Sequence, residues 1–94
     1  MDYLIGQLED EPEFQFIANG TALVKLNLFI QDQEKLQKVI VWGELAEACN
    51  MKLKKMDTIL VTGYMKERSW KYNGEIFHSN DFTAKSVKLL AEGS

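Results

Sequence analysis

The sequence predicts an all-β fold, a Greek-key barrel of five strands with one helix between the third and fourth strands. Two observations lead to this prediction. Two Asn-Gly pairs, Asn19-Gly20 and Asn73-Gly74, each stand between strand-like segments, and Asn-Gly favours a hairpin because both positions of a type I′ turn need a positive φ. Only Glu44–Leu53 has apolar residues at helical spacing. This order of strands and helix is that of the OB-fold, a partly open barrel.

Strand-like stretches separated by turns run through the whole chain. In chain order they cover Tyr3–Leu8, Phe14–Ala18, Thr21–Ile30, Gln37–Trp42, Ile59–Tyr72, Glu75–Asn80 and Thr83–Leu90. The expected helix has one apolar stripe, formed by Leu45, Ala46, Cys49 and Leu53. We therefore interpret Cys49 as a small core residue rather than a nucleophile.

Length and composition limit the kind of protein. The 94 residues predict a single domain, 1–94, and 46% hydrophobic with 27% charged residues is typical of a globular chain. No apolar run reaches the roughly 18 residues that a membrane helix needs, and the start lacks a basic signal region, so we expect a soluble, cytoplasmic chain without membrane contact. One cysteine and one histidine argue against a disulfide framework and a zinc site. We expect no catalysis, because His78 has no neighbour suited to a triad.

Alternation along the strands separates core from surface, because successive side chains point to opposite faces. In Thr21–Ile30 the wholly apolar set is expected in the core and the mixed set outside. The core set is Ala22, Val24, Leu26, Leu28 and Ile30, and the outer set is Thr21, Leu23, Lys25, Asn27 and Phe29. In the next strand Val39 and Val41 suit the core, and Leu36, Lys38, Ile40 and Trp42 face outward.

One face of Ile59–Tyr72 combines bases with aromatic rings. That face carries Leu60, Thr62, Tyr64, Lys66, Arg68, Trp70 and Tyr72. Cations attract the phosphates of a single-stranded nucleic acid, and aromatic rings stack on its bases, whatever the base sequence. The alternative is that Trp70 and Tyr72 are cross-strand packing partners and that Lys66 and Arg68 only keep the hairpin soluble. Trp42 on the outer face of Gln37–Trp42 favours nucleic-acid binding.

The net charge of −3 lowers the expectation of nucleic-acid binding but does not remove it, because binding depends on local fields. The charges are unevenly distributed. Residues 1–13 carry five acids and no base, whereas residues 52–71 carry six bases against two acids.

Three stretches resemble the bacterial-type single-stranded-DNA-binding protein family. They are LIGQLEDEPEFQFIANGTALVKLNLFI, VIVWGELAEACNMKLKKMDTILVTGYMKERSW and FTAKSVKLL. The likeness covers residues 3–90, nearly the whole chain. The resemblance implies an OB-fold without catalysis or cofactor that binds single-stranded DNA in replication, recombination and repair. It also implies a homo-oligomer, either a tetramer or a dimer, and contacts with replication proteins. The location implied is the cytoplasm, in association with the nucleoid, or an organelle; RNA stays open as an alternative ligand.

The resemblance also assigns roles to individual residues. Trp42 matches the stacking aromatic of a [WF]-G motif, and Trp70 matches the aromatic that ends R-x-W. The matching bases are Lys38, Lys55, Lys66 and Arg68. We expect these six residues, with Tyr64, to form the binding face.

The chain departs from the family pattern at several positions. Glu34 and Leu36 stand where further stacking tryptophans are usual, Gln15 and Glu44 replace bases, and Met56 replaces a glycine. Phe29 and Tyr72 are candidate aromatics that compensate. These departures favour a weaker DNA binder, or an OB-fold adaptor that acts through protein contacts in a replication or recombination complex.

Overall fold

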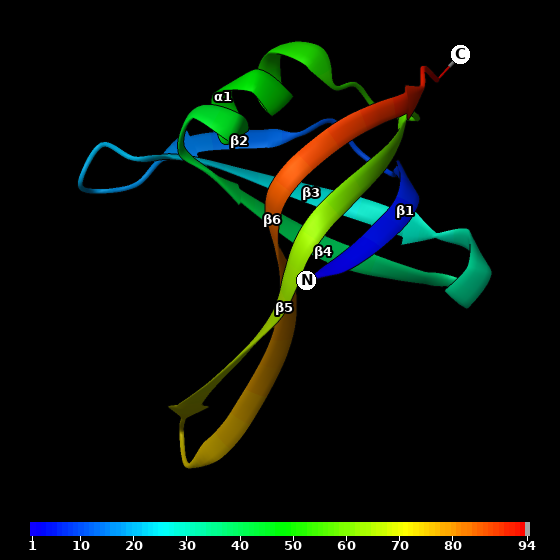
Figure 1. The fold of residues 1–94 in the computed structure, drawn as a ribbon. Helices are drawn as coiled ribbons and strands as arrows, with labels where there is room; N and C mark the ends of the chain where they lie inside the picture. The colour runs from blue at the N-terminus through cyan, green and yellow to red at the C-terminus, as the bar shows by residue number, and fades with distance from the viewer. Residues whose placement is uncertain (94) are drawn as a thin grey trace.

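The computed structural model describes residues 1–93 (Figure 1). The elements, in chain order, are β1 (Asp2–Leu8), β2 (Glu13–Phe16), β3 (Ala22–Ile30), the 3₁₀ turn η1 (Gln31–Gln33), β4 (Lys35–Trp42), α1 (Gly43–Lys52), β5 (Thr58–Tyr72) and β6 (Glu75–Ala91). Helix α1 lies across one end of the strands, and the far parts of β5 and β6 project from the opposite end. In this described part of the chain, no helix is long and apolar enough to cross a membrane.

Five of the strands close into a barrel. They are hydrogen-bonded in the order β1-β5-β6-β4-β3, and a short pairing of β1 with β3 through Gln7 and Leu8 completes the ring. The contact between β4 and β6 is parallel and short, while β2 is a hairpin strand that, among the described residues, is hydrogen-bonded in the sheet to β3 alone. In chain order, β4 and β5 are the third and fourth of the five barrel strands, and helix α1 lies between them. The predicted OB-fold is confirmed.

The expected core is confirmed, with two exceptions on the outer face. The whole apolar set of β3 is buried, as are Val39 and Val41. Leu23 and Ile40, however, are also buried, contrary to the expectation that they face solvent. Leu23 is flanked by β2 and β4, and Ile40 by β3 and β6. These neighbouring strands shield the outer surface at the centre of the sheet, which a pattern along a single strand does not reveal.

The C-terminal strands differ from the prediction in length. Glu75–Asn80 and Thr83–Leu90 were expected as separate strands, but β6 is continuous because Asp81 and Phe82 pair with residues of β5. The register shifts between Thr62 and Gly63, where Lys85 is left as an extra residue on β6. Such a bulge bends a strand and strengthens its twist, so β5 and β6 can curve out of the barrel at this point.

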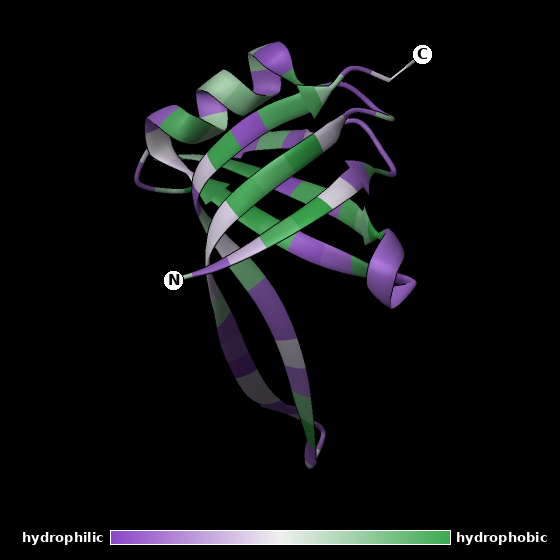
Figure 2. Ribbon diagram, turned by 45° about the vertical axis from the view of Figure 1, so that its right-hand side comes forward, coloured by the Kyte–Doolittle hydropathy of each residue, from purple (hydrophilic) through white to green (hydrophobic). Residues whose placement is uncertain are grey.

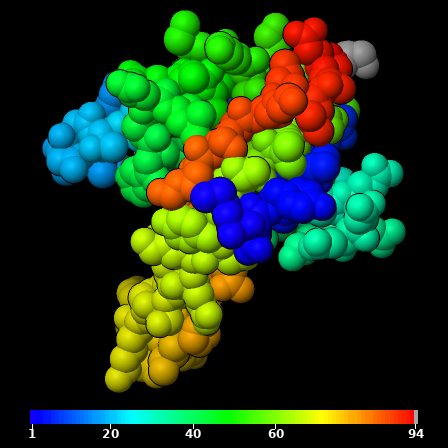
Figure 3. All heavy atoms as spheres, viewed as in Figure 1, coloured from blue at the N-terminus to red at the C-terminus, as the bar shows by residue number. Residues whose placement is uncertain are grey.

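Beyond this bend, residues 65–80 form a two-stranded ribbon that we call the arm (Figure 2). Its strands are mainly hydrophilic, unlike the mainly hydrophobic barrel strands. At the tip, Asn73 and Gly74 both have positive φ, as the type I′ prediction requires. Figure 3 shows the arm standing clear of the rest of the molecule.

The first Asn-Gly pair also forms a hairpin, but its turn differs from the type I′ prediction. Of the two residues, only Gly20 has positive φ, while the Asn19 side chain accepts a hydrogen bond from the Thr21 amide. The Ile17 carbonyl accepts from Gly20, and the Ile17 amide donates to Thr21. The loop is therefore a three-residue turn that ends on a left-handed glycine.

Helix α1 begins one residue earlier than predicted and buries Ala46 and Cys49 against the barrel. The interpretation of Cys49 as a core residue is confirmed, since it is almost fully buried. Burial also raises the pKa of its thiol from 9.0 to about 11, because an apolar environment disfavours the thiolate.

We expect Cys49 to react about 100-fold more slowly with Ellman's reagent at pH 8 in the folded than in the unfolded protein, since only the thiolate attacks and the pKa differs by two units. The same shift lowers stability from pH 9 toward pH 11, because the unfolded thiol loses its proton there while the folded thiol keeps it. Urea titrations should show a smaller loss over that range in Cys49→Ala. Equal thiol reaction rates in water and in denaturant would contradict the prediction.

The turn that follows α1 contains a residue in the left-handed region. Met56 has φ of +80°, a value that favours glycine. Next to it, the buried Asp57 accepts hydrogen bonds from the amides of Lys54 and Gly93, at 2.9 and 2.8 Å. Asp57 thereby ties this turn to the end of β6.

We expect Met56→Gly to raise the free energy of unfolding by about 0.5–1 kcal/mol, since a left-handed L-residue costs roughly 1–2 kcal/mol and glycine loses part of that gain to chain entropy. Met56→Ala is the control because it removes the side chain but keeps the strained backbone. Thermal melts of the two variants give the comparison. A Met56→Gly protein no more stable than Met56→Ala would show that the turn stores no strain.

Candidate nucleic-acid interface

A groove of about 310 Å³ lies on the outer surface of the barrel, where the sheet passes into the arm. Strands β2, β3, β4, β5 and β6 all contribute to its walls. The residues that give it chemical character are Lys25, Trp42, Tyr64, Lys66, Arg68, Asp81 and Lys85. Four of them, Trp42, Tyr64, Lys66 and Arg68, are predicted site residues that the fold brings together.

Trp42 provides the aromatic surface of the groove. It is the last residue of β4 and pairs with Leu23 of β3. Its side chain stays 44% exposed although its neighbours Leu23 and Ile40 are buried. A half-exposed indole beside well-packed apolar side chains is suited to stacking against a planar ligand.

Two lysines that the sequence reasoning did not select complete the positive charge. Lys25 was placed on the outer face of β3 together with Leu23, and this position was the available signal. Lys85 is the extra residue of the β6 bulge, so no alternation pattern identifies its direction. Its Nζ lies 5.4 Å from the ring centroid of Tyr64, a cation–π contact between two side chains of the groove.

Arg68 and Asp81 form an ion pair in the groove. Nη2 of Arg68 lies 2.9 Å from Oδ2 of Asp81, whose side chain is 8% exposed. Together the groove residues carry four cations and one carboxylate, a formal charge of +3 in a chain whose total is −3. Charge of one sign concentrated in a cleft attracts ligands of the opposite sign even where the net charge is unfavourable.

Trp70 and Tyr72 lie on the arm rather than in the groove. Trp70 is paired across the ribbon with Phe77, and the two rings stack with centroids 5.9 Å apart. The packing alternative therefore holds for one face of Trp70, but half of its surface remains exposed. Arg68, Ser69 and Trp70 line a shallow recess on the arm, and Arg68 also lines the groove.

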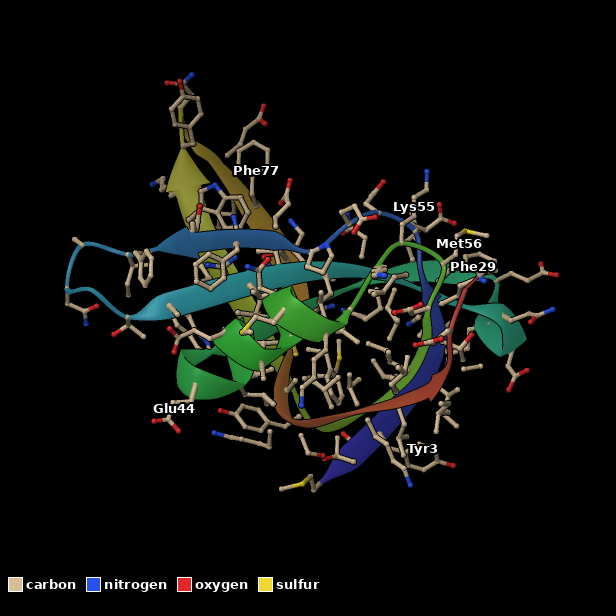
Figure 4. All side chains as sticks on the ribbon, turned by 90° about the horizontal axis from the view of Figure 1, so that it is seen from above. Tyr3, Phe29, Glu44, Lys55, Met56 and Phe77 are labelled. Carbon is tan, nitrogen blue, oxygen red and sulfur yellow. The ribbon has the colours of Figure 1, made fainter. Side chains whose placement is uncertain are left out.

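Three predicted site residues lie away from the groove. Phe29 pairs with Leu36, six residues along β3 from Leu23, a separation of about 20 Å at roughly 3.3 Å per residue. Lys55 lies at the same end of the barrel as Phe29, while Phe77 lies on the arm (Figure 4). Lys38 shares the outer face of β4 with Trp42 but does not line the groove. Phe29 thus does not add to the Trp42 surface.

The groove has the character of a binding surface for an extended anion. Its cationic side chains are lysines and one arginine, and its aromatic residues are Trp42 and Tyr64. Within residues 1–93, no group of three or more His, Cys, Asp or Glu side chains is placed to hold a metal ion.

Comparison with known proteins agrees with this geometry. The model of the single-strand binding protein family matches residues 3–90. The chain is also similar to Single-stranded DNA-binding protein 1 of Chlorobaculum tepidum, with 26% identity over 93% of this chain and 62% of that protein. It thus spans less than two thirds of the length of this relative. Since the family match covers nearly the whole barrel and arm, the chain belongs to the single-strand binding protein family.

Proposed function

We propose that the chain binds single-stranded DNA without dependence on base sequence and without catalysis. Lysines around the groove attract the phosphates, and bases stack on Trp42. The observation that carries this proposal is the concentration of a formal charge of +3 around a half-exposed tryptophan in a chain of net charge −3. The name of the Chlorobaculum tepidum relative supports the same ligand.

The arm provides a second contact for the strand. Trp70 keeps half of its surface exposed while Phe77 holds its ring in place. A ring that is already ordered loses less side-chain entropy when a base stacks on it. Arg68 lines both the groove and the recess beside Trp70, so the two surfaces are neighbours along β5.

A titration of tryptophan fluorescence with oligo(dT) tests the proposal. Trp42 and Trp70 are the only tryptophans in the chain and both lie on the proposed path, so base stacking should quench the emission strongly. If Lys25, Lys66 and Lys85 each neutralise one phosphate, log K should fall with log salt with a slope of about −2 for a single strand. Oligo(U) in parallel measures whether RNA is accepted.

Unchanged fluorescence at low salt, with the protein shown to be folded by circular dichroism, would overturn this proposal. The OB-fold adaptor would then lead, and the groove would be tested against acidic protein segments instead. Binding with a slope near zero would contradict the role of the lysines and leave stacking as the only contact.

We further propose that the chain forms a homo-oligomer through β1. Tyr3 and Ile5 on its outer face are exposed, and within residues 1–93 the strand pairs with β3 only through Gln7 and Leu8, which leaves most of one edge open. Figure 3 shows β1 on the surface of the barrel. Sedimentation equilibrium tests this: a dimer or tetramer that dissociates in Ile5→Asp supports the interface, and a monomeric wild type contradicts it.

We also propose that the chain acts in DNA replication, recombination and repair. The expected location is the cytoplasm, in association with the nucleoid, or an organelle.

A further inference from the structure

Asp81 is a carboxylate placed inside a groove that otherwise attracts phosphates. It pairs in register with Lys66 across the ribbon, but its nearest cation is Arg68, two residues further along β5. Asp81 is buried, whereas Arg68 is mostly exposed. An acid at this point needs an explanation, because a negative charge repels the phosphates of the proposed ligand.

The burial of Asp81 ties Arg68 to it. A carboxylate removed from water is destabilising unless a cation and hydrogen bonds compensate it. Arg68 supplies that compensation at 2.9 Å, so a phosphate that recruits Arg68 leaves Asp81 unpaired or approaches it closely. Lys25, Lys66 and Lys85 form no ion pair within residues 1–93 and are available to phosphates.

We infer that Asp81 determines which part of the nucleic acid enters the groove. By pairing with Arg68 it makes that part of the groove electrically neutral, so that a base lies there beside Trp42 while the phosphates follow the lysines. Arg68, one of the predicted phosphate ligands, is then not a phosphate contact. This inference rests on the proposed binding of single-stranded DNA.

The pair also suits a ligand of any base sequence. Arg68 offers only hydrogen-bond donors and Asp81 only acceptors, side by side. Each of the four bases presents both donors and acceptors on its Watson–Crick edge, which single-stranded nucleic acid exposes to proteins. A neutral donor–acceptor pair can therefore face any base, whereas a lone arginine would favour a phosphate.

The slope of log K against log salt for oligo(dT) tests the inference, since it counts phosphate contacts. Lys66→Gln should reduce the magnitude of the slope by about 0.7, and Arg68→Gln should reduce it much less. Asp81→Asn should raise affinity at low salt and increase the magnitude of the slope by about 0.7, because the released Arg68 then binds a phosphate. Arg68→Gln combined with Asp81→Asn should abolish that increase. Glu67→Gln is the matched control, because it removes the same charge from the exposed opposite face of β5 and should leave the slope unchanged.

Each other outcome has a distinct meaning. The inference is overturned if Arg68→Gln reduces the magnitude of the slope as much as Lys66→Gln does. It is also overturned if Asp81→Asn has the same slope as the wild type. Either result leaves the proposed function intact. Absence of binding by the wild-type protein overturns the proposed function itself. If Arg68→Gln alone does not fold because Asp81 is left unpaired, Asp81→Asn and the double variant still decide the question, since neither contains the buried carboxylate.

Discussion

Trp42→Ala should weaken binding of oligo(dT) by about 5- to 150-fold at low salt, since stacking of one base is worth roughly 1–3 kcal/mol. The loss should be large because Trp42 is the larger of the two aromatic residues of the groove and lies next to Leu23 and Ile40, which are buried on the same outer face of the sheet. Anisotropy of a labelled oligonucleotide measures the effect independently of tryptophan emission. The salt slope should stay near the wild-type value, because no phosphate contact is removed.

Two variants separate stacking from other consequences of the substitution. Trp42→Phe keeps a ring and should retain most of the affinity. Trp70→Ala should lose less than Trp42→Ala, because one face of Trp70 is already covered by Phe77 and the residue lies on the arm. A folded Trp42→Ala protein that binds as tightly as the wild type would exclude the groove as the binding site.

Gly63→Ala should lower the free energy of unfolding by about 3 kcal/mol, near the upper end of what overpacking a dense interior costs. Gly63 is the residue of β5 at which the register shifts and the arm leaves the barrel. A Cβ atom there would collide with the backbone carbonyl of Thr83 on β6, and a backbone atom cannot move aside as a flexible side chain can. At roughly 4–8 °C per kcal/mol for a domain of this size, the melting temperature should fall by more than about 12 °C.

Gly74→Ala is the matched control for this experiment. It makes the same substitution at the tip of the arm, where nothing lies within 4 Å of the new Cβ and only the φ of +82° opposes it. Its cost should be about 0.5–1 kcal/mol, because the penalty of a left-handed L-residue, roughly 1–2 kcal/mol, is partly offset by the lower chain entropy of alanine in the unfolded state. If Gly63→Ala were no more destabilising than Gly74→Ala, the close approach of β5 to β6 would not be essential to the barrel.

The two predictions concern one region of the molecule. Gly63 allows the backbone of β5 to approach that of β6 closely. Tyr64, the next residue, is the first of its strand to line the groove. Thr83 belongs both to the backbone that Gly63 approaches and to the groove wall. The bend that directs the arm outward therefore also shapes the binding surface.

Much of the barrel follows from local features of the sequence. Alternation in Ala22–Ile30 identifies the core side of β3, since every second residue is apolar and all five are buried. Two Asn-Gly pairs locate the β2–β3 and β5–β6 hairpins, because few residues accept the positive φ that such turns need. Trp42, Tyr64, Lys66 and Arg68 are likewise on the predicted faces of their strands.

Only the tertiary structure decided how those faces meet. Alternation tells which side of its own strand a residue occupies, but not which strands lie beside it. Phe29 and Lys25 share one face of β3, yet only Lys25 reaches the groove. Lys85 lies on a bulge, where one extra residue breaks the alternation. The Asn73-Gly74 turn sets the register that places Lys66 opposite Asp81. Only the three-dimensional arrangement of the side chains decides that Asp81 pairs with Arg68 instead, two residues further along β5.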